Sequence, residues 1–201
     1  MDESEFFTGL KKYHTKNLLF KMVLEKFADD ISKLACSLNL NKNSRVLDAG
    51  CGNGFLMKEL RKRITKPIFY GIDILEKSVN YARGLNPNSK FFVGNIENMP
   101  FKDNFFDLVL CSEVIEHICS PEKAIKEIKR ITKKYAIVCV PYEPFFTIAN
   151  LARLKYLRKF GNYPGHVQRF GKTKLNKLLK KYFQKVLISN STFWLVALCE
   201  K

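Results

Sequence analysis

The spacing of apolar residues changes near residue 44. Between residues 17 and 40 they recur at steps of three and four, which predicts one long amphipathic helix. After residue 44, short apolar runs alternate with amphipathic stretches, as in a parallel sheet covered by helices. The helix face expected to pack on the core consists of Leu19, Met22, Val23, Phe27, Ile31, Leu34 and Leu38.

Five apolar runs predict buried strands, and four amphipathic stretches predict helices between or after them. The expected strands are 45–50, 67–74, 90–95, 105–113 and 134–141, and the expected helices are 53–64, 75–84, 120–131 and 172–183. We expect Leu56, Leu60 and Ile64 to face inward, Gly84 to end its helix as a left-handed cap, and Ser120 with Pro121 to begin the next helix.

Two final strand-like runs, 183–190 and 192–200, predict a closing hairpin. The expected fold is therefore α/β: a Rossmann-like, seven-stranded, mostly parallel sheet with a terminal antiparallel hairpin and helices on both faces. We expect a single domain over 1–201, with an N-terminal helical cap at 1–43 and a substrate-covering insertion at 142–171.

The composition restricts the class of protein to which this chain can belong. The chain has 201 residues, enough for one well-filled core, and it contains no apolar run of membrane-spanning length. The first residues start acidic and lack the basic segment followed by an apolar segment that is typical of a secretory signal. Six cysteines include no CxxC pair, and Cys51, Cys111, Cys139 and Cys199 lie in or beside apolar stretches. We expect a soluble cytoplasmic protein with reduced thiols and no metal.

The formal net charge of +16 admits a nucleic-acid partner or peripheral contact with an anionic membrane. The lysines are spread along the whole chain, however, which equally fits an ordinary solvated surface. Residues 150–160 form a basic amphipathic pattern that fits a lid helix, a membrane-surface helix or an ordinary surface helix. The oligomeric state is not predicted.

The stretch RVLDAGCGNGF, residues 45–55, contains the strongest chemical signal. Gly50 and Gly52 permit a tight turn and let a ligand lie against bare backbone. The spacing GxGxG lacks the third glycine of a dinucleotide fingerprint, and no P-loop ending follows. Asp73 ends the second strand, about 20 residues further on, where a carboxylate accepts bonds from ribose hydroxyls. These features predict a ribose-containing cofactor without a pyrophosphate.

Four stretches, VLDAGCGNG, GIDI, GNIENMPF and FDLVLCSEVIEHI, give the chain a family resemblance over about residues 40 to 140. It resembles the class I S-adenosylmethionine-dependent methyltransferases, in particular the branch of quinone-biosynthesis and related small-molecule methylases. The resemblance implies S-adenosylmethionine as cofactor and S-adenosylhomocysteine as product. The family usually has Asp at the position of Asn95, whose amide oxygen can still accept a bond from the adenine amino group.

The same resemblance assigns a cofactor site. Gly50 and Gly52 would pass under the methionine part, Asp48 would anchor the ammonium, and Asp73 would hold the ribose. The full set implied is Asp48, Gly50, Cys51, Gly52, Asp73, Ile74, Asn95, Ile96, Cys111 and Ser112. Simpler interpretations stay open for three of them: Asp48 as a helix cap, Cys111 as core, and Asn95 as a turn residue.

Two histidines are candidate general bases for an acceptor that must lose a proton. His117 is typical of the family and lies four residues after Glu113, which would place both on one helical face; alternatively, it braces the turn. His166 lies in the expected insertion, and a structural role is an equal alternative for it.

The expected function is methyl transfer to O or C of a small-molecule acceptor. An RNA methyltransferase, acting for example on tRNA, is the alternative, because a tRNA-modifying group shares this core and the chain is basic. Nucleic acid is not favoured, since the motifs for methylating base amines and pyrimidine carbons are absent from the sequence. A third hypothesis is a non-catalytic module that keeps the cofactor fold as a scaffold.

Overall fold

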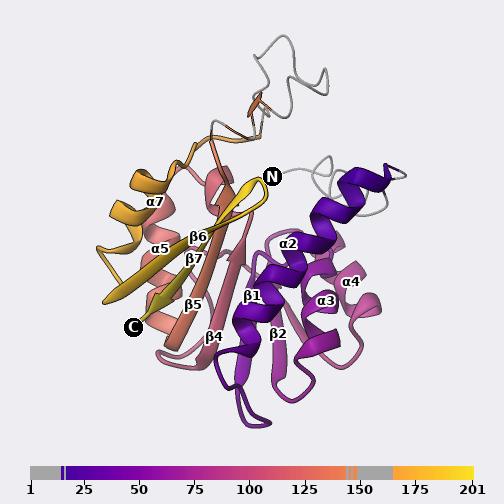
Figure 1. Cartoon of the computed structure of the whole chain (residues 1–201). Coiled ribbons are helices and arrows are strands. Elements are labelled where there is room, and N and C mark those ends of the chain that lie inside the picture. The colour runs from indigo at the N-terminus through magenta and orange to yellow at the C-terminus, as the bar shows by residue number, and fades with distance from the viewer. Residues whose placement is uncertain (1–14, 16, 144, 146, 149–164) are drawn as a thin grey trace.

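A computed structural model of the chain describes residues 15, 17–143, 145, 147–148 and 165–201 (Figure 1). The helices are α2 (Leu18–Cys36), α3 (Phe55–Arg63), α4 (Glu76–Leu85), the 3-10 helix η1 (Ile115–His117), α5 (Pro121–Ile131) and α7 (Lys172–Leu179). The strands are β1 (Arg45–Ala49), β2 (Ile68–Asp73), β3 (Lys90–Val93), β4 (Phe106–Ser112), β5 (Thr132–Pro141), β6 (Lys185–Ser191) and β7 (Trp194–Glu200).

All seven strands form one sheet in the order β3-β2-β1-β4-β5-β7-β6. Strands β1 to β5 are mutually parallel, and β7 runs antiparallel to both β5 and β6. The predicted seven-stranded sheet and its closing hairpin are confirmed. The strand order reverses between β1 and β4, so the crevice outside their carboxyl ends is where an open α/β sheet binds its ligand.

Helices cover both faces of the sheet, each over its own apolar cluster (Figure 1). Helices α5 and α7 pack on one face, where Ile125, Ile128 and Leu175 are fully buried. Helices α2, α3 and α4 pack on the other face, where Phe27 of α2 stacks on Trp194 of β7 at 4.4 Å between ring centroids. The first long helix therefore packs on the sheet beside the terminal hairpin.

The buried face of α2 differs from the predicted one. Leu19 and Met22 are 75% and 56% exposed. Phe27 and Ile31 are buried as expected, but the face is completed by Leu24, Ala28, Ser32 and Ala35. These positions also recur at steps of three and four. The prediction is wrong because alanines, rather than the large Leu19 and Met22, lie on the buried face. Their small side chains allow the helix to approach the sheet closely.

The end of α4 also differs from the prediction, which placed a left-handed cap at Gly84. Gly84 lies inside the helix, which continues to Leu85 and is capped at Asn86. The buried Asn86 side chain donates to the carbonyl of Gly54 at 3.0 Å, so it ties the end of α4 to the start of α3. The other local predictions are confirmed: Leu56, Leu60 and Ile64 are buried, and α5 begins with Pro121 after Ser120.

No helix in the described part of the chain is both long enough and apolar enough to cross a membrane. Cys51, Cys111, Cys139 and Cys199 are buried free thiols, as their apolar surroundings in the sequence predict. The two flanks of the 142–171 segment lie side by side at the end of β5, because the amide of Glu143 donates to the carbonyl of Phe170 at 3.1 Å. Most of this segment, residues 149–164, lies outside the described residues, as does the predicted basic helix at 150–160.

Candidate active site

The glycine turn after β1 lies at the carboxyl end of the sheet, next to the strand-order reversal. Gly50 and Gly52 both have positive φ, at 78° and 49°. A Cβ atom on Gly50 would lie 2.3 Å from a Val114 methyl carbon, so packing against the β4 corner excludes a side chain there. A Cβ on Gly52 would meet no atom within 4 Å. The turn therefore packs on one side at Gly50 and presents bare backbone to open space at Gly52.

Asp73 connects the end of β2 to this turn. Its Oδ2 accepts the amide N–H of Gly52 at 2.8 Å, and its Oδ1 accepts that of Leu75 at 2.9 Å. Burial raises the pKa of this carboxyl, while the Leu75 and Gly52 amides act in the opposite direction. The amide of Ile74 also donates to this carboxylate. The two oxygens together offer about four acceptor positions, which leaves acceptor capacity for a further donor.

Asp48 lies in β1 and is 3% exposed. Burial, assisted by the negative charge of Asp73, raises the pKa of Asp48 to about 7. Its Oδ2 is buried and has no hydrogen-bond partner among the described residues. Helix α3 begins after Gly54 without a side-chain cap, so the interpretation of Asp48 as a helix cap is wrong. A buried carboxyl oxygen of this kind favours a cationic or hydrogen-donating ligand group.

The ends of β2 and β3 present the next predicted residues. Ile74 is 48% exposed, whereas Ile96 is 8% exposed and belongs to the core cluster. The Asn95 Oδ1 accepts the amide of Glu97 at 2.9 Å, the geometry of a turn residue. The amide of Gly94 donates to the carbonyl of Asp73 at 2.9 Å, which holds the two strand ends together. This edge therefore offers an apolar surface at Ile74 and an exposed amide at Asn95.

The corner after β4 differs from its predicted form. Glu113 has φ 57°, a strained value for a residue other than glycine, and residues 115–117 make a 3-10 turn. Glu113 accepts the Trp194 indole N–H at 2.8 Å, while His117 points to Gly165. The expected common helical face for Glu113 and His117 is therefore wrong. The left-handed residue separates them.

Cys111 and Ser112 end β4 at this corner. The Cys111 side chain is fully buried in the core, and burial, followed by the charge of Glu116, raises the pKa of its thiol. Asp48 contributes to the same shift, so the negative charges of Glu116 in η1 and Asp48 in β1 both act on this thiol. Cys111 thus packs as core, and only its main chain remains for the predicted contact with a ligand.

The two candidate bases come together although 48 residues separate His117 from Gly165, the neighbour of His166. The His117 and His166 rings lie 5.1 Å apart between centroids at 72°. His117 Nδ1 lies 2.9 Å from the Gly165 carbonyl oxygen. Because a carbonyl only accepts, Nδ1 carries the hydrogen and the lone pair of the neutral ring is on Nε2.

Glu116 belongs to the same place but was not predicted from the sequence. It is 1% exposed, and its main-chain carbonyl accepts the amides of Val167 and Gln168, each at 2.9 Å. The corner after β4 therefore fixes the segment that carries His166. The only signal in the sequence was an acidic residue that follows the apolar Val114 and Ile115 and directly precedes His117.

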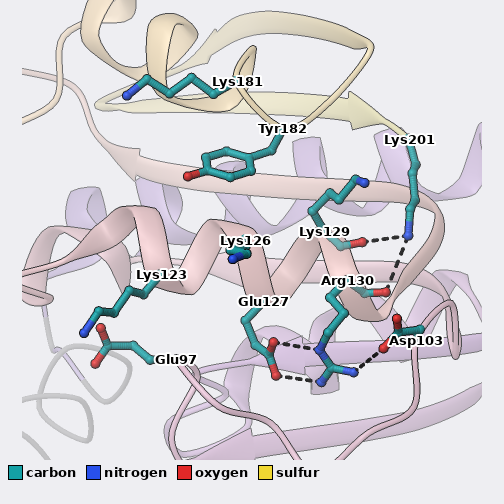
Figure 2. Close-up of a pocket in the computed structure, with 10 residues that line it drawn as sticks. All are labelled: Glu97, Asp103, Lys123, Lys126, Glu127, Lys129, Arg130, Lys181, Tyr182 and Lys201. Carbon is teal, nitrogen blue, oxygen red and sulfur yellow. Dashed lines mark hydrogen bonds and ion pairs between the residues drawn. The ribbon is translucent and has the colours of Figure 1, made fainter.

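A separate pocket of about 560 Å³ lies over α5 and is lined mainly by charged residues (Figure 2). Arg130 bridges Glu127 and Asp103, each at 2.6 Å. The Lys201 ammonium donates to main-chain carbonyls at the end of α5, including that of Thr132 at 2.8 Å. Lys123, Lys126 and Lys129 also line it. Its lining lacks every residue predicted for the cofactor, so this pocket is distinct from the glycine turn.

The family model of a methyltransferase domain matches residues 40–187. The chain is 36% identical to a sterol 24-C-methyltransferase of Gibberella zeae over 57% of this chain and 31% of the relative. It spans about half or less of the length of the first curated relatives it matches.

Solved structures share the fold. The PH0226 protein of Pyrococcus horikoshii gives a TM-score of 0.75 at 19% identity, covering 100% of this chain and 99% of that one. The magnesium protoporphyrin IX methyltransferase of Synechocystis, solved with S-adenosylhomocysteine, gives 0.72 at 19% identity, with coverages of 98% and 94%.

Proposed function

The chain belongs to the class I S-adenosylmethionine-dependent methyltransferases, and on that premise we propose that it transfers a methyl group from S-adenosylmethionine to an oxygen or carbon of a small molecule. The observation that carries the proposal is the buried Asp48 Oδ2 beside the open turn at Gly52. S-adenosylmethionine brings an ammonium group, and an unsatisfied buried carboxyl oxygen is a suitable partner for it.

The remaining predicted residues fit the rest of the cofactor. Asp73 would accept the ribose hydroxyls with its remaining lone pairs while it keeps Gly52 in place. Ile74 offers half-exposed apolar surface for the adenine, and the exposed Asn95 amide offers an acceptor and donors for the adenine edge. Gly50, Cys51, Ile96 and Ser112 would act mainly through their backbone.

S-adenosylmethionine supplies a methyl group on a sulfonium, which an acceptor lone pair displaces in line, leaving S-adenosylhomocysteine. The residues of the chain must hold the acceptor in line with that methyl group and keep water away. His117 Nε2 or His166 would take the proton of an acceptor hydroxyl or acidic carbon. The Gly165 carbonyl keeps the His117 ring oriented for this task.

An apolar acceptor is supported by the segments that flank residues 149–164. Phe145, Ile148 and Val167 are each more than half exposed there. A relative is a sterol methyltransferase, and a structural neighbour acts on a porphyrin. We place the activity in the cytoplasm, where buried free thiols such as Cys111 and Cys139 stay reduced.

The alternative acceptor is RNA, for which the supporting observation is the lysine-lined pocket over α5. The two acceptor classes differ in their response to salt. Binding of RNA through lysines would fall by orders of magnitude between 50 and 200 mM salt, because counterions are released. Methyl transfer to a neutral small molecule would change little over that range.

The test combines cofactor binding with an acceptor survey. Calorimetry with S-adenosylmethionine should show one site per chain, and Asp73→Asn should weaken binding, whereas Asn104→Asp, at a distant turn, should not. Radiolabelled cofactor is then supplied with a small-molecule extract or with total RNA. Label in the small-molecule fraction supports the proposal. Label in RNA alone, or an unaltered affinity in Asp73→Asn, refutes it.

A further inference from the structure

Three side chains with metal-binding atoms converge at the corner after β4. One ligand atom each from Glu116, His117 and His166 lies within 4.8 Å of the other two. The first two residues belong to η1, and the third comes from the segment before α7. We propose that these three residues bind a divalent transition-metal ion, although the sequence analysis predicted a protein without a metal.

The ligand types define the ion. Two imidazoles and one carboxylate suit Zn²⁺ and neighbouring ions such as Co²⁺ or Fe²⁺, whereas Mg²⁺ and Ca²⁺ require mainly oxygen ligands. Three protein ligands leave coordination positions open, which is typical of a catalytic metal rather than a structural one.

The surroundings of His117 prepare it for this role. Its Nδ1–H donates to the Gly165 carbonyl at 2.9 Å, which orients the ring and leaves the Nε2 lone pair as the ligand. Metal-binding histidines generally make such a bond to a carbonyl or carboxylate. Glu116 is 1% exposed, and a carboxylate at such depth is stabilised by a bound cation.

The main chain also brings the third ligand into place. The Glu116 carbonyl accepts the amides of Val167 and Gln168, so the residue next to His166 is bonded to the neighbour of His117. Ligand atoms of one Zn²⁺ lie about 3–3.5 Å apart, given bond lengths near 2.1 Å. The cluster must therefore contract by at most roughly 1.3–1.8 Å, which a rotation of the partly exposed His166 side chain can provide.

The position of the cluster suggests what the metal holds. Val114, two residues before Glu116, packs against Gly50 of the glycine turn, so the cluster borders the proposed cofactor site. If the proposed function holds, an acceptor with a hydroxyl group would bind at an open position of the metal, and the metal, in place of His117 or His166 as base, would lower the pKa of that hydroxyl. The proton would pass to solvent, and the oxygen lone pair would form the bond to the methyl carbon as the carbon–sulfur bond breaks toward sulfur.

The test uses the full chain without a polyhistidine tag, stripped with a chelator. Titration with Zn²⁺ should give one site per chain with micromolar or tighter affinity, and Co²⁺ should give a visible absorption band. His166→Ala should weaken Zn²⁺ binding by about 100-fold or more, as loss of one of three ligands requires. The matched controls are Cys119→Ser, an exposed thiol nearby, and Glu122→Gln, an exposed carboxylate, neither of which should change the affinity.

Glu116→Gln and His117→Ala should also abolish the Co²⁺ band, and circular dichroism monitors their folding. His166 is partly exposed, so its variant stays interpretable if the buried ones misfold. Absence of stoichiometric binding of Zn²⁺ or Co²⁺, or binding that survives His166→Ala, overturns the inference. S-adenosylmethionine is titrated separately: normal cofactor binding without metal binding refutes only the metal site, and the reverse refutes only the proposed function.

Discussion

The amide N–H of Gly52 donates to Oδ2 of Asp73 at 2.8 Å, so the glycine turn and the acidic end of β2 form one hydrogen-bonded unit. The residue that would hold the ribose also fixes the backbone on which the methionine part would lie. We therefore expect substitutions at either position to affect cofactor binding through both contacts.

Asp73→Asn should weaken S-adenosylmethionine binding by roughly 10- to 100-fold, the loss expected for charged hydrogen bonds. Its amide can accept from Gly52 or from Leu75, but one oxygen cannot accept both bonds in their present geometry. Asp73→Ala should abolish binding and also lower the melting temperature, because both backbone donors lose their acceptor. Calorimetry and thermal melting separate the effects. Unchanged affinity in Asp73→Asn would show that the site lies elsewhere.

Gly50→Ala should destabilise the protein through a clash with Val114 as well as through its positive φ. Val114→Ala in the same chain should recover part of that loss, since the clashing atoms are the Val114 methyl carbons. Gly52→Ala meets no neighbouring atom, so it should cost only about 1–2 kcal/mol of backbone strain while it impairs cofactor binding. Denaturant unfolding of these three variants measures both costs, and a double variant no more stable than Gly50→Ala would exclude the clash.

Asp48 should make cofactor binding depend on pH near neutrality. Its pKa of about 7 means that the carboxyl gains its charge between pH 6 and pH 8. The affinity for the cationic cofactor should therefore rise over this range and release a proton, which calorimetry in buffers of different ionisation enthalpy detects. Asp48→Asn should give a weaker affinity without that dependence. A wild-type affinity independent of pH would contradict this.

The same carboxyl should destabilise the ligand-free fold at high pH. A pKa raised above its ordinary value of 3.8 means that the folded state holds the proton more tightly than the unfolded state. Stability from this group is thus present at low pH and lost as pH rises toward 7. Asp48→Asn should stabilise the protein by on the order of 3 kcal/mol at pH 8 and by much less at pH 4.5. Denaturation curves at both values measure the difference.

Substitutions of Glu113 should separate the cost of its positive φ from the contribution of its hydrogen bond to Trp194. Glu113→Gln keeps an acceptor for the Trp194 indole and should cost little. Glu113→Ala loses the acceptor yet keeps the positive φ, and Glu113→Gly loses the acceptor but relieves the strain. The glycine variant should therefore be about 1 kcal/mol more stable than the alanine variant. The opposite order in denaturant unfolding would mean that the corner is not strained.

The sequence sufficed for features that depend on neighbouring residues. The strands, the glycine turn and Asp73 at a strand end all have local signatures, and the predicted sheet is confirmed. The errors arose where tertiary contacts decide. Gly84 has the residue type of a helix cap, but the buried Asn86 side chain ends the helix by bonding to another helix. The left-handed conformation of Glu113 has no local signal, and its hydrogen-bond partner Trp194 lies 81 residues further along the chain.

The catalytic candidates illustrate the same limit. His117 and His166 were each identifiable, but their approach to 5.1 Å depends on the pairing of distant segments through Gly165 and the Glu116 carbonyl. A buried Glu116 could not be distinguished in the sequence from a surface acid.

The bond between Trp194 and Glu113 links the terminal hairpin to the corner after β4. The indole belongs to β7, which pairs with β5, and the carboxylate belongs to the corner that leads into η1. Loss of the pairing between β7 and β5 would therefore also release the strained corner, so the hairpin bears directly on the segment that carries His117.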